Sequence, residues 1–271
     1  MTGSIEGAPR RIPVDGAVGD AATRSWWNAE ADAYQAEHED ALGAVRWSWG
    51  PEGWTDDDLH LLRARPGDRV LELGCGAAAG ARALVARGVH AVGLDISHRM
   101  LQHSRRLDEQ AGVAVPVVEA SAAALPFRPD TFDLVATSYG ALPFVAETDQ
   151  VLSEIARVLT PGGRAVLAVT HPFRWSFLDD PGQSGLTAVR SYFDRTPYTE
   201  VDDRGQVVYV EHHRTVGDWV ALLVAAGLVV EQLVEPTWNP ENDRTWGGWS
   251  PLRGSLFPGT LILCAGKPAG R

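Results

Sequence analysis

The chain has 271 residues, a formal net charge of −11, 45% hydrophobic residues and 22% charged residues. This length is enough for one large domain with additions, and the composition excludes wholesale disorder. The acidic balance argues against a general affinity for nucleic acid or for anionic membrane surfaces.

The first 65 residues divide into a tail and a helical cap. Residues 1–20 are rich in Gly, Pro, Ala and Arg, which favours a mobile tail. Residues 21–44 have a helical composition. Thr55 and Asp58 form a capping-box pattern, with a hydroxyl at the N-cap and a carboxylate three residues later, and predict a helix from about Asp56 to Arg65. We therefore expect residues 21–65 to form a helical N-terminal cap.

From residue 66 the chain alternates between short apolar strands and helices. The expected strands are 69–73, 90–94, 116–119, 132–137 and 164–170. The expected helices between them are 78–87, 99–111 and 148–159. Strands that alternate with helices of this length predict an α/β fold with a mostly parallel sheet covered on both faces.

After residue 170 the chain is less regular. Two segments rich in Pro, Gly and aromatic residues lack a sustained period, and we expect insertions at about 171–210 and 235–259. Thr215 and Asp218 form a second capping box and predict a helix that ends at Gly227. The remaining apolar runs predict strands at 228–234 and 260–265. The expected domain therefore spans residues 66–267.

A glycine-rich loop follows the first of these strands. Gly74 and Gly76 let a ligand approach the backbone, and the next helix begins with free N–H groups. Ala79 stands where a dinucleotide-binding fingerprint has its third glycine. Glu72 would face the ligand with a negative charge, which suits a cation better than a pyrophosphate. Asp95 closes the second strand and is placed to accept both hydroxyls of a ribose, although a tight turn with an ordinary surface aspartate fits the same residues.

Several segments then occur in a characteristic order. They are Glu72-Leu-Gly-Cys-Gly76, Asp95, Leu125-Pro-Phe127, Phe132-Asp133 and Arg157-Val-Leu-Thr-Pro-Gly-Gly163. Together they resemble the signature segments of class I S-adenosylmethionine-dependent methyltransferases, in the branch of the ubiquinone and menaquinone methyltransferases. The resemblance covers about residues 69–170. It implies a Rossmann-like seven-stranded sheet with an antiparallel last strand, S-adenosyl-L-methionine as cofactor, and methyl transfer to a small, hydrophobic or aromatic acceptor.

Carried over onto this sequence, the resemblance implies a cofactor site at the strand ends. Its residues are Glu72, Gly74, Cys75, Gly76, Asp95, Ile96, Met100, Ser121, Ala122, Ser138 and Tyr139. Asp95 holds the ribose, Ile96 or Met100 packs on the adenine, and the last two residues lie near the transferring methyl. The family commonly has an aspartate where Ser121 stands, and that aspartate receives the adenine amino group. The Ser121 hydroxyl or a backbone carbonyl can accept the same hydrogen bond.

The sequence indicates the acceptor-binding residues less directly than the cofactor-binding residues. His171 is the candidate general base, because it follows the fifth strand at the ligand-binding edge and imidazole titrates near neutrality. A structural role in the turn before Pro172 is the alternative. Most of the ten tryptophans fall in the cap and the insertions, which predicts an aromatic cover over the acceptor or an extra packing layer. The expected substrate-binding residues are Trp27, Tyr34, Trp49, Phe173, Trp175, His213, Arg214 and Trp238.

The sequence also bears on other kinds of site and on other classes of protein. No spacing of His, Cys, Asp or Glu places several metal ligands on one helix face, so we expect no metal site. Cys75 and Cys264 provide no disulfide framework, and neither a membrane span nor a signal peptide is apparent, so we expect a cytoplasmic protein. A non-catalytic S-adenosylmethionine-binding protein stays open as an alternative, as does, less favoured, an NAD-linked oxidoreductase. The sequence indicates neither the oligomeric state nor the acceptor atom.

Overall fold

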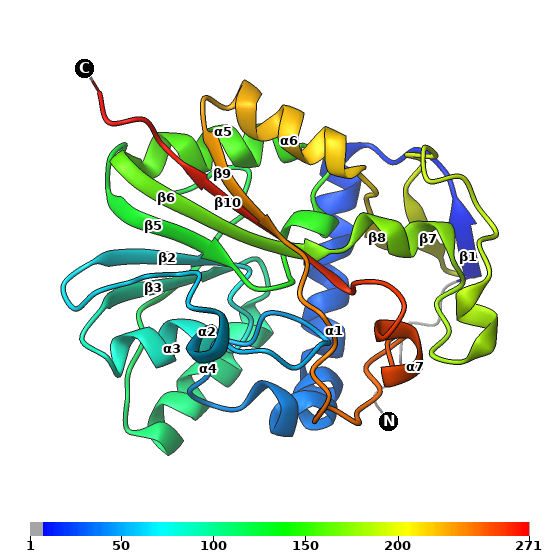
Figure 1. The fold of residues 1–271 in the computed structure, drawn as a ribbon, viewed down its shortest axis with the longest axis horizontal. Helices are drawn as coiled ribbons and strands as arrows, with labels where there is room; N and C mark the ends of the chain where they lie inside the picture. Colours follow the sequence, from blue (N-terminus) through cyan, green and yellow to red (C-terminus); the bar gives the residue numbers. More distant parts are fainter. Residues whose placement is uncertain (1–7, 271) are drawn as a thin grey trace.

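The computed structural model describes residues 8–270, and a seven-stranded sheet organises them (Figure 1). The strand order is β4-β3-β2-β5-β6-β10-β9. The strands are β2 (Arg69–Leu73), β3 (His90–Asp95), β4 (Val117–Glu119), β5 (Phe132–Thr137), β6 (Leu159–Thr170), β9 (Val229–Val234) and β10 (Thr260–Gly266). β10 runs antiparallel to both of its neighbours, while the pairs from β4 to β6 are parallel. The predicted α/β sheet with an antiparallel last strand is confirmed.

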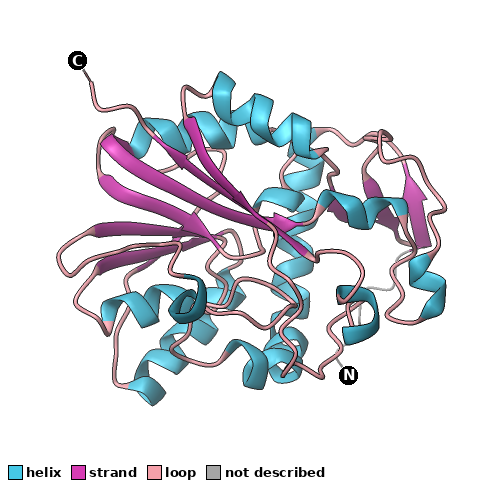
Figure 2. Cartoon of the chain, in the orientation of Figure 1, coloured by secondary structure: helices cyan, strands magenta, loops and turns pink. Residues whose placement is uncertain are grey.

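Helices cover both faces of this sheet (Figure 2). One face carries α5 (Thr148–Val158) and α6 (Val216–Ala225), and the other carries α3 (Ala79–Val85) and α4 (His98–Ala111). Shorter helical segments are α2 (Asp56–Leu59), α7 (Pro251–Gly254) and the 3₁₀ turns η1 (Leu142–Phe144), η2 (Pro172–Ser176) and η3 (Gln183–Leu186). Side chains cap two of these helices: Ser97 accepts the Met100 N–H at the start of α4, and Thr215 accepts the Asp218 N–H at the start of α6, as its capping box predicts.

The alternation of side chains along β2 explains where the core and the site lie. Leu71 and Leu73 are buried in the core under α5 and α6, while Val70 is buried in the core on the α3 side. Since successive side chains of a strand point to opposite faces, Glu72 points to the α3 side, as Val70 does. Its carboxylate therefore meets the beginning of α3, directly after the glycine loop.

A second sheet and one long helix stand beside the main sheet. The helix is α1 (Gly16–Leu42), and the second sheet has the order β1-β7-β8, with β1 (Ala8–Arg11), β7 (Tyr198–Val201) and β8 (Val207–Glu211). Figure 1 shows α1 between the carboxyl ends of the main strands and this small sheet. The N-terminal cap and the first insertion are thus one layer, because β1 pairs with β7.

Two expectations for the N-terminal region need correction. The expected tail reaches residue 20, but Ala8–Arg11 is a strand and the helix already begins at Gly16; residues 1–7 lie outside the described part. Composition could not reveal a strand whose partner lies about 190 residues later in the chain. The Arg11 guanidinium secures it by donating to the Thr196 carbonyl at 2.8 Å and stacking on Trp175.

The helix expected from Asp56 to Arg65 is also shorter than predicted. Its capping interaction forms, because Asp58 accepts the Thr55 N–H at 2.9 Å. The helix nevertheless ends at Leu59, since His60 adopts a left-handed conformation with φ of 52°. Asp56 then accepts the N–H groups of the two leucines that follow His60, which holds the chain in a turn instead of a helix.

Candidate cofactor and acceptor site

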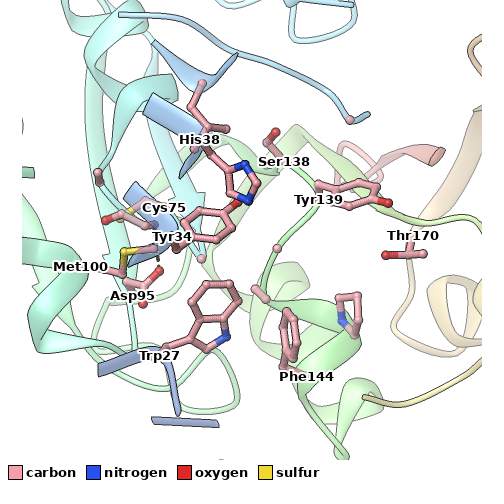
Figure 3. A pocket seen from close by; sticks show the side chains of 18 of the residues that line it. Trp27, Tyr34, His38, Cys75, Asp95, Met100, Ser138, Tyr139, Phe144 and Thr170 are labelled. Atoms are coloured by element: carbon pink, nitrogen blue, oxygen red, sulfur yellow. Dashed lines mark hydrogen bonds between the residues drawn. The ribbon is translucent and has the colours of Figure 1, made fainter. Parts of the chain in front are cut away.

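A cavity of about 470 Å³ opens where the parallel strands end. This volume lies within the range of sites for small molecules, roughly 300–1,000 Å³. The walls come from the loops after β2, β3, β4 and β5, from one face of α1, and from the segments 46–51 and 246–249. Figure 3 shows the side chains that line it, with Asp95 and Met100 on one side and Tyr139 and Thr170 on the other.

Every residue of the cofactor site that the resemblance implies lines this cavity. They are Glu72, Gly74, Cys75, Gly76, Asp95, Ile96, Met100, Ser121, Ala122, Ser138 and Tyr139. Apart from Met100, in the first turn of α4, these residues lie at or just after the ends of adjacent parallel strands, so the sheet topology brings them together.

The glycine loop and Asp95 form one hydrogen-bonded unit. The Asp95 carboxylate accepts the Gly76 N–H and the Ser97 N–H, both at 2.8 Å. Gly74 and Gly76 have φ of 61° and 53°, the left-handed region that favours glycine. Burial raises the pKa of Asp95, which is 8% exposed. The carboxylate is therefore fixed at the floor of the cavity before any ligand arrives.

Glu72 places a second carboxyl group at this end of the cavity. It is 4% exposed and accepts the Ala81 N–H, in the first turn of α3, at 2.7 Å. Burial raises the pKa of Glu72 to about 8, although the Ala81 N–H and the nearby Arg82 oppose the shift. The side chain is thus mostly protonated at neutral pH in the free protein.

The loop after β5 has an unusual backbone. Tyr139 and Ala141 both have positive φ, 63° and 58°. The Gly140 N–H donates to the Ser138 carbonyl at 2.7 Å, and the Leu142 N–H donates to the Gly140 carbonyl at 2.8 Å. These are two successive γ-turns in the strained, positive-φ form. The two turns place the Tyr139 ring at the cavity (Figure 3). No residue type in the sequence predicted this backbone conformation.

One face of α1 forms a wall of the cavity. The lining residues Asp20, Thr23, Trp27, Tyr34 and His38 follow one another at spacings of three, four, seven and four, which places them on one helix face. Two of them, Trp27 and Tyr34, were expected to bind substrate. The helical spacing was the signal that could have identified the other three.

Contacts with α4 hold α1 in this position. Asn28 accepts hydrogen bonds from the Ser97 hydroxyl at 2.9 Å and from the Arg99 N–H at 3.0 Å. Asp32 binds both the Arg99 guanidinium at 2.8 Å and the His103 ring at 2.7 Å. Because Ser97 also caps α4 two residues after Asp95, these contacts anchor α1 next to the Asp95 end of the cavity.

Asp20 supplies a carboxylate where the chain has a serine in place of the usual aspartate. The Ser121 hydroxyl donates to the Asp20 carboxylate at 3.2 Å, and both residues line the cavity. A carboxylate from α1 therefore lies beside the Ser121 hydroxyl in the cavity. Sequence reasoning missed it because it lies about 100 residues away, in the segment expected to be a tail.

The opposite end of the cavity is aromatic and contains a charged cluster. Trp246, Trp249 and Tyr209 line it together with Arg174, Asp179 and Glu211. The Arg174 guanidinium binds Glu211 and Asp179, each at 3.1 Å. Burial works to lower the pKa of Arg174, but the two carboxylates outweigh it and raise that pKa above its ordinary value. The sequence indicated aromatic insertions here but not this cluster.

His171 is not among the residues that line the cavity. It is 4% exposed, its Nδ1 accepts the Phe173 N–H at 3.1 Å, and its Nε2 therefore donates to Glu235 at 2.9 Å. Burial lowers its pKa despite the glutamate. Both ring nitrogens are engaged in the turn after β6, so the structure gives His171 the structural alternative and not the role of base.

The other expected substrate residues also lie outside the cavity wall. They are Trp49, Phe173, Trp175, His213, Arg214 and Trp238. His213 contacts the Tyr192 carbonyl and Trp238 the Asn242 carbonyl, while Arg214 donates to the carbonyls of the loop before α5. Trp49 is almost fully buried against Trp47. Most of these side chains pack against other parts of the chain instead of lining the cavity, whereas Phe173 is 46% exposed.

The described residues were also expected to contain no metal site and no membrane span. Between residues 8 and 270, no three His, Cys, Asp or Glu side chains are grouped as a metal site would need. The helices of that same range include none with both the length and the apolarity to cross a bilayer.

Comparisons with known proteins agree with this geometry. The family model described as "Methyltransferase domain" matches residues 71–167. A demethylmenaquinone methyltransferase of Beutenbergia cavernae is 40% identical over 179 residues, which cover 66% of this chain and 70% of that protein. One from Streptomyces avermitilis is 36% identical over 120 residues, or 44% of this chain and 50% of that protein. The chain thus spans about half the length of several curated relatives that it matches.

A solved structure gives the same result for the fold. The S-adenosylmethionine-dependent methyltransferase from Mesorhizobium loti superposes with a TM-score of 0.59 at 25% identity, covering 80% of this chain and 100% of that one.

Proposed function

The chain belongs to the class I S-adenosylmethionine-dependent methyltransferases, in the branch of the quinone methyltransferases, and from that premise we propose that it methylates a small, hydrophobic or aromatic acceptor. The observation that carries the proposal is the cavity at the strand ends, which the whole expected cofactor set lines. The comparisons favour neither an NAD-linked oxidoreductase nor a binding protein without catalysis.

The residues at the cofactor end fit S-adenosylmethionine. Asp20, Glu72 and Asp95 give this end three carboxyl groups, which suit a ligand with a sulfonium, an ammonium and ribose hydroxyls better than one with a pyrophosphate. Asp95 would accept the ribose hydroxyls, Met100 would pack on the adenine, and Glu72 would border the methionine part. When bound, the cofactor supplies a methyl group that its sulfonium has already activated.

The chain's own contribution is alignment and exclusion of water. The rings of Trp27, Tyr34 and Tyr139 surround the middle of the cavity (Figure 3). The Trp246 indole lines the same cavity. An aromatic enclosure holds a planar acceptor in line with the methyl group and keeps water away from it. The acceptor is therefore a small molecule that fits within this enclosure.

Net charge and cysteine content bear on the compartment and on the class of substrate. We propose that the protein acts in the cytoplasm and on no nucleic acid, because its net charge is −11 and Cys75 and Cys264 are buried free thiols.

Calorimetry tests the proposed function. The protein is titrated with S-adenosylmethionine, S-adenosylhomocysteine and NAD, and we expect binding of the two sulfur ligands only. Formation of S-adenosylhomocysteine is then followed over a panel of quinones, phenols and amines. The absence of affinity for both sulfur ligands would contradict the proposal.

Replacing Asp20 by alanine is expected to weaken S-adenosylhomocysteine binding about tenfold, because a charged acceptor for the adenine amino group is lost, at about 1.4 kcal/mol. The comparison ligand is S-inosylhomocysteine, whose ring has an oxo group where adenine has the amino group. Its affinity should not fall in the variant. Glu30→Ala, on the same helix but away from the cavity wall, is the matched control. Equal losses for both ligands would remove this role from Asp20.

The raised pKa of Glu72 predicts a proton release on cofactor binding. A cationic ligand favours the carboxylate, so a group with a pKa of about 8 loses its proton when the ligand binds at pH 7. The affinity for S-adenosylmethionine should therefore increase from pH 6.5 to pH 8.5, by at most about tenfold per pH unit below that pKa. Calorimetry in two buffers of different ionisation enthalpy measures the released proton. The Glu72→Gln variant should show neither effect, and a wild-type protein that releases no proton would contradict this prediction.

A further inference from the structure

We propose that His38 is the general base of the site, and that the acceptor is an aromatic molecule whose methylated atom carries an ionisable O–H or N–H. This inference rests on the proposed methyl transfer and adds to it the chemical class of the acceptor and the group that receives its proton.

The position of His38 is the first observation. It lies on α1 one turn after Tyr34 and lines the cavity, with its ring projecting into the space between Tyr34 and the loop of Ser138 (Figure 3). The imidazole stacks on Trp246, with ring centres 4.9 Å apart at 28°, and meets the edge of Tyr34 at 4.5 Å. Two aromatic contacts from different parts of the chain therefore fix the plane of the ring.

The ring nitrogens of His38 are the second observation. Within the described residues neither nitrogen has a hydrogen-bond partner, and no other histidine lines the cavity. His171, by contrast, uses both ring nitrogens, while His213 binds a backbone carbonyl through Nε2 and its buried Nδ1 has no partner, as is also true of His212 Nε2. An imidazole that is oriented by packing but left without a partner is available to a ligand.

The protonation state agrees with this geometry. Burial lowers the pKa of His38, and the charge of Glu37 only partly offsets that effect. The titratable and charged groups that share its part of the cavity are Tyr34 and Glu37 on α1, Arg46 on the next segment, and Tyr139 after β5. At neutral pH the imidazole is therefore uncharged and holds a free lone pair, which is the form a general base needs.

The step that His38 assists can be written in full. The oxygen or nitrogen of the acceptor forms a bond to the methyl carbon, and the carbon–sulfur bond breaks with its electron pair on sulfur. The O–H or N–H proton passes to the imidazole and from there to solvent. An acceptor without an ionisable proton gains nothing from this base, while one with an aromatic ring also stacks within the walls that Trp27, Tyr34 and Trp246 form.

Two phenols that differ in acidity test the proposal. At pH 8.5 the hydroxyl of 4-methylphenol is protonated, whereas 4-nitrophenol is mostly ionised and needs no base. We expect His38→Gln to lower kcat/KM for 4-methylphenol about 100-fold or more and to leave 4-nitrophenol nearly unchanged. The wild-type profile for 4-methylphenol should rise with pH through a pKa below the ordinary value of about 6.5, and the variant should lack that rise.

Controls separate this role from a structural one. His90→Gln changes an exposed histidine at the start of β3, away from the cavity, and should leave both rates and the pH profile as in the wild type. His38→Asn serves as a second variant, and thermal unfolding checks that each variant is folded. Equal losses on both phenols, or a loss on neither, would overturn the role of His38. Binding of S-adenosylhomocysteine without transfer to either phenol would overturn the acceptor class, whereas absence of that binding would contradict the proposed function itself.

Discussion

Gly74→Ala is expected to lower the free energy of unfolding by about 2–4 kcal/mol and to abolish measurable cofactor binding. A Cβ at this position would lie 2.6 Å from the Ala141 Cβ and 3.0 Å from the Ala141 nitrogen. The left-handed φ of 61° adds about 1–2 kcal/mol for a residue with a side chain, and overpacking adds a similar amount. Urea unfolding measures the stability, and calorimetry with S-adenosylhomocysteine measures the binding.

A neighbouring glycine provides the matched control for that prediction. Gly76 also has a positive φ, but a Cβ there would meet only the Met100 methyl at 3.7 Å. Gly76→Ala should therefore lose only the backbone contribution, about 1–2 kcal/mol. Adding Ala141→Gly to the Gly74 variant should restore part of the stability, because it removes the colliding Cβ and relaxes a residue with φ of 58°. Equal losses at both glycines, together with no rescue, would show that the contact between the two loops is unimportant.

Asp95→Ala is expected to weaken S-adenosylhomocysteine binding by about 100- to 1,000-fold, or about 3–4 kcal/mol. The carboxylate would accept both ribose hydroxyls, and hydrogen bonds to a charged group contribute about 1.5–3 kcal/mol each. The same oxygens already hold the N–H groups of Gly76 and Ser97 at 2.8 Å. The substitution therefore removes the ligand contacts and loosens the loop that the ligand touches.

A ligand analogue separates these two roles of Asp95. The 2′-deoxy form of S-adenosylhomocysteine lacks one ribose hydroxyl, so the wild-type protein should bind it more weakly than the parent ligand. Asp95→Ala should bind the two forms almost equally. Asp95→Asn keeps an oxygen for one backbone N–H and should lie between the wild type and the alanine variant. A variant that still discriminated strongly between the two ligands would exclude the ribose role of Asp95.

The cofactor half of the cavity was predictable because each of its parts is local in the sequence. Gly74 and Ser138 directly follow their strands and Asp95 is the last residue of its own, and a parallel sheet necessarily aligns those strand ends. Strand and helix boundaries in this region agree with the predicted ones to within about two residues, except that β6 begins at Leu159 and not at Arg164. Hydrophobic alternation and capping residues carry that information over short distances.

The acceptor half depends on contacts between distant segments, and the sequence contains no local signal for them. His171 does follow its strand, but β6 pairs there with antiparallel β10, and the His171 N–H donates to the Gly259 carbonyl at 2.7 Å. The strand edge is therefore covered at that point and the imidazole turns to Glu235. The role of each tryptophan was equally ambiguous in the sequence. An indole can pack on another side chain, as Trp175 packs on Arg11, or it can line the cavity, as Trp246 does.

The pairing of β1 with β7 has a consequence for engineering acceptor selectivity. Residues 8–42 and 171–211 contribute to one sheet and pack α1 against β8, although the whole cofactor-binding part of the chain separates them. A chimera that takes only one of these segments from a relative would leave strand β1 or strand β7 with a mismatched partner. The two segments therefore form a single transplantable unit, and a graft that exchanges both at once, with residues 69–170 untouched, is the shortest route to a new acceptor preference.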